Sequence, residues 1–245
     1  MIKVVIPCGP VESLIGRCLD SLLAQEETDW EAVVIMDPCG DDSVAKATPY
    51  RSEKIRVIAN RDRAYALKNI ADGIDILRPE DDDIIILVDG DDYLPGTQAF
   101  SKVLETYDTT DCLVTHGSYM SHSNGEPSIL NAPYEPEDRA HNLRKTRWRG
   151  SHLRTYKYKV WKRINQKDFL DPQGEWFRTA WDLAIMFPAM EMAGHERTKF
   201  ISDIVYVHND ENPQSDHYVA LQNQMQMTDY IASRNPYAEV EDWRQ

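Results

Sequence analysis

The chain contains the stretch Ile84-Ile85-Ile86-Leu87-Val88-Asp89-Gly90-Asp91-Asp92. Five aliphatic residues in a row are typical of a strand that is buried on both faces of a sheet. In open α/β sheets, ligands bind outside the carboxyl ends of the strands. The acidic residues that follow Val88 therefore predict a binding site at the end of this strand.

The first hundred residues alternate between short apolar runs and segments of helical periodicity, which predicts an α/β fold with a parallel sheet covered by helices. We expect strands at residues 4–6, 32–36, 55–58, 84–88, 112–115 and 204–207. We expect helices at residues 11–22, 67–77, 97–107, 179–192 and 218–231, and a hairpin turn at 123–126. No repeat or linker interrupts the chain, so the sequence predicts a single domain over residues 1–245.

Charge is distributed unevenly along the 245 residues, which contain 27 Lys and Arg against 41 Asp and Glu, a net charge of −14. The segment from Arg139 to Lys167 contains basic residues and no acid. Aromatic residues such as Trp148 and Tyr156 lie within it. This basic segment predicts either a site for an anionic ligand or a solvated face that offsets its acidic neighbours.

The longest aliphatic run is far shorter than the roughly 20 residues of a membrane-spanning helix. The start of the chain, Met1-Ile2-Lys3-Val4, lacks the apolar core of a signal peptide. We therefore expect no membrane span and a cytoplasmic location.

The acidic stretch suits a metal ion that binds a diphosphate. Side chains two apart on an extended segment point the same way, so Asp89 and Asp91 would converge on one cation. Gly90 would let a phosphate or ribose approach the backbone. Mg²⁺ or Mn²⁺ typically binds one or two carboxylates together with substrate phosphates. The alternative is a solvated acidic turn.

These segments resemble the family 2 glycosyltransferases of GT-A fold. The resemblance rests on Val4 to Pro7, the helix Gly16 to Gln25, Asp37 with Asp41 to Ser43, Asn60 to Asn69, and Leu87 to Asp92. It implies an inverting, metal-dependent enzyme that moves a sugar from a nucleoside-diphosphate sugar, with a UDP-sugar as the leading candidate, to a hydroxyl acceptor. Mn²⁺ or Mg²⁺ would be the cofactor. Residues 1–117 would bind the nucleotide sugar, and residues 118–245 would bind the acceptor and carry the catalytic base.

The resemblance also implies roles for individual residues. Pro7 and Asp37 would contact the nucleobase, and Asn60 and Lys68 would also bind the donor. Asp89 and Gly90 would bind the nucleotide sugar. Asp89 and Asp91 would hold the metal, as His208 would from a loop that resembles the one closing over the nucleotide in many GT-A enzymes. The alternative is that His208 is only a loop histidine.

Asp182 corresponds to the family's catalytic base, an Asp at the start of a helix. A helix amino terminus would keep this carboxylate ionised. The alternative is purely structural, because Thr179-x-x-Asp182 is also a capping-box pattern.

The basic segment contains further candidates for donor binding. Arg149 and Arg154 suit phosphate oxygens because arginine stays charged and binds them in a bidentate manner. His152 would bond a phosphate or an acceptor hydroxyl.

Two other functions remain open. Nucleotidyltransfer uses a similar sheet and metal, although Cys8-Gly9-Pro10 is too short for a glycine-rich phosphate loop. A non-catalytic module would bind a sugar nucleotide or glycan without turnover. The expected acceptor is a saccharide, and the basic and aromatic segment leaves a modified base in nucleic acid as another option.

Overall fold

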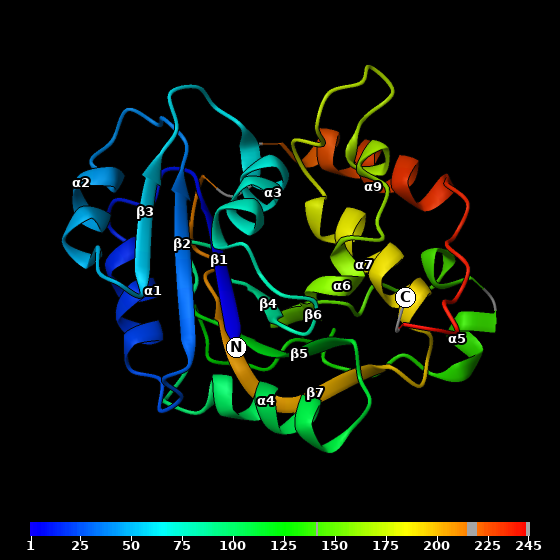
Figure 1. Cartoon of the computed structure of the whole chain (residues 1–245). Coiled ribbons are helices and arrows are strands. Elements are labelled where there is room, and N and C mark those ends of the chain that lie inside the picture. The colour runs from blue at the N-terminus through cyan, green and yellow to red at the C-terminus, as the bar shows by residue number, and fades with distance from the viewer. Residues whose placement is uncertain (141, 215–219, 244–245) are drawn as a thin grey trace.

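The computed structural model describes residues 1–140, 142–214 and 220–243, and a seven-stranded sheet forms its centre (Figure 1). The strands are β1 (Ile2–Cys8), β2 (Trp30–Met36), β3 (Ile55–Ala59), β4 (Ile84–Leu87), β5 (Val114–Ser121), β6 (Arg154–Lys157) and β7 (Thr198–His208). Their order across the sheet is β3-β2-β1-β4-β6-β5-β7. Only β6 runs antiparallel to its neighbours in the described sheet, so the prediction of a mostly parallel α/β sheet is confirmed.

The described helices include one at or near each of the five predicted ranges. They are α1 (Ile15–Leu23), α2 (Ser43–Ala47), α3 (Tyr65–Leu77), α4 (Ala99–Thr109), α5 (Pro136–Ala140), α6 (Tyr158–Trp161), α7 (Trp181–Ala193) and α9 (Leu221–Ser233). The expected start of the last helix, Tyr218, lies outside the described residues. In the described part of the chain, no helix combines the length and apolar character needed to cross a membrane.

Two apolar clusters cover the two faces of the sheet, because alternate residues of each strand point to opposite faces. Val5 of β1 belongs to the cluster that includes α3 and α7. Val4 and Ile6 belong to the cluster that includes α1 and α4. Figure 1 shows the same arrangement, with α1 and α4 on one side of the strands and α3 and α7 on the other. Each fully buried Val, Leu or Ile side chain contributes about 1.5–3 kcal/mol to such a core.

Gly73 lets α3 lie close to the sheet. A Cβ atom at this position would be 2.6 Å from Cγ1 of Val5 and 3.1 Å from Cγ1 of Val33. The close approach places the amino end of α3 beside the carboxyl ends of β1 and β2, where the acidic residues also lie.

The sequence did not predict β6, which lies inside the basic segment. Its residues, Arg-Thr-Tyr-Lys, do not alternate between apolar and polar in the usual way of a half-buried strand. It is nevertheless buried because β4 and β5 pair with it on both sides. The register pairs Arg154 with Leu87, so this arginine lies beside the end of β4.

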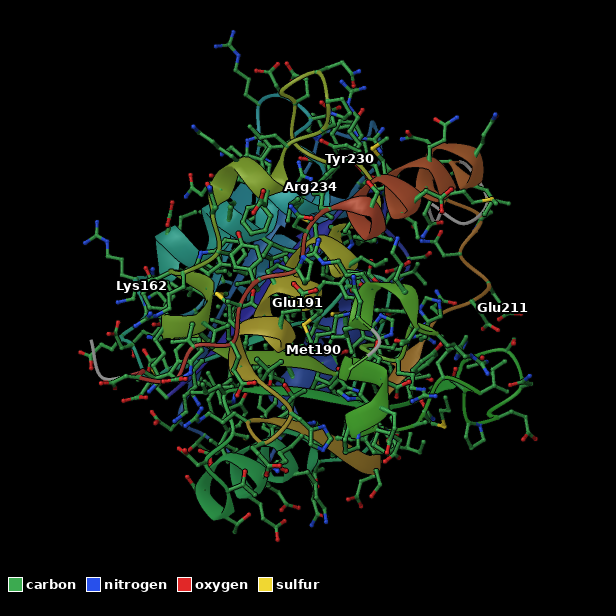
Figure 2. The ribbon with its side chains drawn as sticks, turned by 90° about the vertical axis from the view of Figure 1, so that its right-hand side faces the viewer. Lys162, Met190, Glu191, Glu211, Tyr230 and Arg234 are labelled. Carbon is green, nitrogen blue, oxygen red and sulfur yellow. The ribbon has the colours of Figure 1, made fainter. Side chains whose placement is uncertain are left out.

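A buried ion pair holds the carboxyl-terminal half of α7. Glu191 accepts hydrogen bonds from Nε and Nη2 of Arg144 at 2.6 and 2.7 Å, and both side chains are almost fully buried. The same carboxylate accepts a bond from the backbone N–H of Tyr237, and Arg144 also donates to the carbonyl of Ile231 in α9. Figure 2 shows Glu191 on α7 near the middle of this side of the molecule, below Arg234. The pair thus joins α7 to α9 and to the segment that contains Tyr237.

We predict that Arg144→Met strongly destabilises the protein, because it leaves Glu191 as a buried and unpaired charge. Removing one partner of a buried pair costs about 3–5 kcal/mol. The control is Lys162→Met, which removes the cation of an exposed pair with Asp81. Exposed pairs contribute about 0–1 kcal/mol. The free energy of unfolding, measured by urea denaturation, should fall much more in the first variant, and equal losses would contradict the prediction.

Candidate functional site

A cavity of about 500 Å³ lies at the carboxyl ends of β1 and β4. It brings together nine of the residues predicted from the sequence. These are Pro7, Asp37, Asp89, Gly90, Asp91, His152, Arg154, Asp182 and His208. Residues far apart in the chain thus share one space, as expected for a ligand site in an open α/β sheet.

Three predicted residues do not line this cavity. Lys68 forms an ion pair with Asp72 on α3 and lies over the ring of Trp176. Arg149 pairs with Asp138 at 2.6 Å. Asn60 lies behind the cavity wall, where its side-chain amide donates to Asp37. Their proposed contacts with the donor stay predictions.

The acidic residues after β4 form a turn. The N–H of Asp92 donates to the carbonyl oxygen of Asp89 at 3.0 Å, so the segment is not extended, and the expected two-residue alternation does not apply. Asp89 and Asp91 still reach the same cavity because the turn curls around its end. A Cβ atom at Gly90 would overlap Sγ of Cys8 in β1, so only glycine fits at the centre of the turn.

The carboxylates of this turn lie close together in a buried place. Burial and the charge of Asp92 raise the pKa of Asp89 to about 8. The same two causes raise the pKa of Asp91 to about 6, although a hydrogen bond from the side-chain amide of Asn212 lowers it in part. Such crowding of negative charge favours a cation at this site.

Asp92 is completely buried and organises the neighbouring loop. Its carboxylate accepts hydrogen bonds from the hydroxyl of Tyr206 and the N–H of Asn209, both at 2.7 Å. Nδ1 of His208 lies 3.3 Å from the same carboxylate. One buried side chain therefore fixes the end of β7 against the turn after β4.

Two histidines join Asp92 in a potential metal cluster. Ligand atoms of Asp92, His152 and His208 lie within 4.8 Å of one another. The ring of His152 stacks between Tyr206 and His208, with centroid distances of 4.4 and 5.3 Å. Carboxylates suit Mg²⁺ and Mn²⁺, and imidazole nitrogens suit transition metals, so the donor set fits a divalent cation. Of the three metal ligands predicted from the sequence, this cluster includes only His208.

The two imidazoles differ in charge state. Burial, followed by the charge of Arg154, holds the pKa of His152 well below its usual value, so this ring is neutral, as a metal ligand must be. Burial also lowers the pKa of His208, but the hydrogen bond to Asp92 and the nearby carboxylates outweigh it and raise that pKa to about 9.

Arg154 connects the acidic turn to Asp182. Its Nη2 lies 3.4 Å from a carboxylate oxygen of Asp182, and its Nη1 lies 3.8 Å from a carboxylate oxygen of Asp89. The guanidinium also stacks over Trp181, with its Cζ atom 4.8 Å from the ring centroid. Its Nε and Nη1 atoms are buried without a hydrogen-bond partner in the described structure. Buried polar groups are normally satisfied, so these two atoms lack the partner that a bound ligand would supply.

The capping alternative for Asp182 is not what the structure contains. Asp182 lies in the first turn of α7, but the cap residue is Ala180, which has no side-chain hydroxyl. The hydroxyl of Thr179 is buried without a hydrogen-bond partner in the described structure. The side chain of Asp182 instead faces the cavity beside Arg154.

Asp37 builds the opposite wall of the cavity. Its carboxylate accepts bonds from the side-chain amides of Asn60 and Asn69 and from the N–H groups of Ala64 and Tyr65, at 2.8–3.0 Å. These four donors bind the end of β2 to the amino end of α3. Asp37 thereby shapes the wall, and its contact with a nucleobase stays a prediction.

Several side chains of the basic segment form ion pairs within the protein. Lys157 and Lys159 both pair with Asp82, and the other pairs of this segment are Lys162 with Asp81, Arg149 with Asp138 and Arg144 with Glu191. Arg154 alone among its described arginines lines the cavity. The alternative of a charge-balanced face thus describes most of this segment better than a continuous anion track.

Several residues at the site were missed in the sequence. Asp92 belongs to the acidic motif and was a visible candidate, whereas Tyr206 and Asn212 carry no motif of their own. Arg63, Tyr65 and Arg178 also line the cavity. Only the folded chain brings the loop before α3 and the segment before α7 together.

We predict that Gly90→Ala displaces the acidic turn, because the new methyl group overlaps Sγ of Cys8. Overpacking of this kind costs about 1–3 kcal/mol. Calorimetry should show a lower unfolding temperature and weaker binding of Mn²⁺. The double variant Cys8→Ala/Gly90→Ala removes the overlapping sulfur and should recover part of both losses. No recovery would contradict the steric explanation.

We also predict that, without metal, the protein becomes less stable as the pH rises from 6.5 to 9. A group whose pKa is raised by folding loses its stabilising contribution as the pH rises through the folded value, which applies to Asp89 at about 8 and His208 at about 9. Bound Mn²⁺ supplies positive charge to the same groups, so the decrease should be smaller with Mn²⁺ than with EDTA. Unfolding temperatures across this range test the prediction, and parallel curves would contradict it.

Comparisons with known proteins agree with this geometry. The family model described as Glycosyl transferase family 2 matches residues 3–168. Glycosyltransferase EpsJ of Bacillus subtilis (strain 168) is 27% identical over 233 residues, which cover 88% of this chain and 62% of that protein. The chain thus spans about three fifths of the length of this curated relative.

Solved structures share the fold at low sequence identity. Residues 1–349 of S. aureus TarS with UDP-GlcNAc give a TM-score of 0.65 at 15% identity, over 94% of this chain and 66% of that one. Glucosyl-3-phosphoglycerate synthase from Mycobacterium tuberculosis with Mg²⁺ and UDP gives 0.63 at 13% identity, over 97% and 80%. These neighbours have the GT-A fold, so the predicted fold is confirmed. The chain belongs to glycosyl transferase family 2.

Proposed function

We propose that the protein is an inverting, metal-dependent glycosyltransferase that moves a sugar from a nucleoside-diphosphate sugar to a hydroxyl acceptor. The observation that carries this proposal is the position of Asp182. Its carboxylate faces the same cavity as the acidic turn and His208, and Arg154 lies between them. A base and a diphosphate site that share one cavity suit a single displacement, in which the acceptor oxygen attacks the sugar as the diphosphate departs.

The donor's diphosphate would lie against the turn after β4. Asp91, Asp89 and His208 would hold Mn²⁺ or Mg²⁺ there, with Asp92 and His152 close enough to share in its coordination or to orient the other ligands. When bound, the ion supplies positive charge that offsets the negative charge on the departing diphosphate. Gly90 leaves room for the substrate beside the backbone.

Arg154 and Asp182 supply the other groups that the sugar transfer requires. Arg154 lines the cavity and is almost fully buried, and a charge-assisted hydrogen bond from its guanidinium to the diphosphate or the sugar would be strong there. Asp182 accepts the proton of the acceptor hydroxyl as this oxygen attacks the sugar. The guanidinium of Arg154 lies 3.4 Å from a carboxylate oxygen of Asp182 and would hold this carboxylate in place beside the sugar.

Structural neighbours support the choice of donor. TarS has been crystallised with UDP-GlcNAc, and a mannosyltransferase from Pyrobaculum calidifontis with GDP-Man and Mn²⁺ gives a TM-score of 0.64 at 14% identity, over 97% of this chain and 65% of that one. A UDP-sugar is therefore our leading candidate donor. A saccharide is our leading acceptor. A nucleic acid acceptor has little support, because Arg154 alone among the described arginines of the basic segment lines the cavity, and it already lies beside Asp182.

A panel of sugar nucleotides incubated with the protein and Mn²⁺ separates the possible functions. Metal-dependent release of nucleoside diphosphate, increased by added saccharides, supports the proposal. Release of pyrophosphate would instead indicate a nucleotidyltransferase. Binding without any release would indicate a non-catalytic module.

We predict that Asp182→Asn retains binding of UDP and Mn²⁺ but transfers sugar about 10²–10⁴ times more slowly, the range expected for loss of a general base. Titration calorimetry measures the binding, and product formation measures the transfer. Asp111→Asn serves as a control because this side chain is 91% exposed and pairs with Arg197 at the surface. Unchanged transfer by Asp182→Asn would refute its role as the base.

A further inference from the structure

Two arginines meet on one aromatic ring at the edge of the cavity. The Cζ atom of Arg63 lies 4.5 Å from the ring centroid of Tyr65, and that of Arg178 lies 5.1 Å from the same centroid. All three residues line the cavity. Cation–π contact with a tyrosine attracts each guanidinium and holds it in place. We refer to Arg63, Tyr65 and Arg178 as the arginine clamp.

Neither arginine of the clamp has an acidic partner. Across the described residues, no carboxylate lies within 4.0 Å of the charged nitrogens of Arg63 or Arg178. Both charges lie within 5.1 Å of the same point, so their separation is no more than twice this distance. Charges about 10 Å apart or closer repel each other with incomplete screening at ordinary salt. An anion bound close to both guanidinium groups would relieve this repulsion.

The clamp stands apart from the predicted diphosphate site. The N–H of Tyr65 bonds to Asp37, which places the ring on the wall formed by the ends of β2 and α3. Arg178 comes just before α7, in the segment that leads to Asp182. The clamp therefore connects the wall of the cavity with the segment that carries the candidate base, whereas the acidic turn and His208 lie at the end of β4 and β7.

We propose that the arginine clamp binds a phosphate or carboxylate group of the acceptor, so that the acceptor is a hydroxyl compound with a single nearby negative charge. This inference rests on the proposed function, because Asp182 defines the acceptor side. Arginine binds such groups with paired hydrogen bonds and remains charged at any physiological pH. Two guanidinium groups suit one small anion, so the geometry favours a small anionic group over a long polyanion.

Glycerol 3-phosphate is a suitable probe, with glycerol as its uncharged counterpart. Titration calorimetry measures the binding of each to the protein saturated with UDP and Mn²⁺. We expect the wild type to prefer glycerol 3-phosphate. Arg63→Gln and Arg178→Gln should each weaken its binding by about tenfold, as expected for loss of a charge-assisted hydrogen bond. The affinity for UDP should not change in either variant.

Arg61→Gln is the matched control, since Arg61 is an exposed arginine of the same loop that does not line the cavity. It should leave both affinities unchanged. Equal binding of glycerol and glycerol 3-phosphate by the wild type would overturn the inference, as would equal losses in Arg61→Gln and Arg178→Gln. A loss of UDP affinity in the clamp variants would assign the clamp to the donor instead. If the wild type fails to bind UDP with Mn²⁺, the proposed function fails, and the same titration without UDP still tests the clamp.

Discussion

Three carboxylates lie close together at the end of β4, and most of the candidate site depends on how the protein stabilises their negative charge. Asp89, Asp91 and Asp92 follow one another in a tight turn whose centre admits only glycine. The innermost of them, Asp92, is balanced within the protein by a tyrosine hydroxyl, a backbone N–H and an imidazole. The outer two have no such set of donors, and their raised pKa values show that the fold alone does not stabilise their ionised forms. A divalent cation is the simplest complement to this arrangement.

The antiparallel strand β6 interrupts the parallel order of the sheet. It carries Arg154, which connects the two sides of the cavity. It inserts between β4 and β5 and brings Arg154 next to the acidic turn. From there the guanidinium reaches Asp182, whose helix is itself held by the buried pair of Arg144 and Glu191. The basic segment thus contributes mainly through single, buried contacts. Its net charge has less influence on the site than the position of one arginine.

Much of the fold could be predicted from the sequence because its signals are local. The aliphatic run of β4 and the helical spacing of α3 each determine a short segment without help from the rest of the chain. The strand β6 had no such signal, since its residues are polar and its burial comes entirely from neighbours. The sequence correctly placed the acidic motif at the end of a buried strand. Its expected extended geometry was wrong, because the chain turns immediately after Val88.

The same distinction applies to the site. Asp182 lies at the start of a predicted helix and His208 follows a predicted strand, and both line the cavity. The family resemblance placed Lys68 at the donor; in the structure Lys68 pairs with Asp72 on α3, and its contact with the donor stays a prediction. Tyr206 and the pair Arg63 and Arg178 depend on contacts between distant segments, which no local pattern records.

A crystal of the protein grown with UDP and Mn²⁺, measured at the manganese absorption edge, tests the central claim most directly. The account predicts an anomalous peak between the turn after β4 and His208, in contact with the diphosphate, and a peak elsewhere or none at all would contradict it.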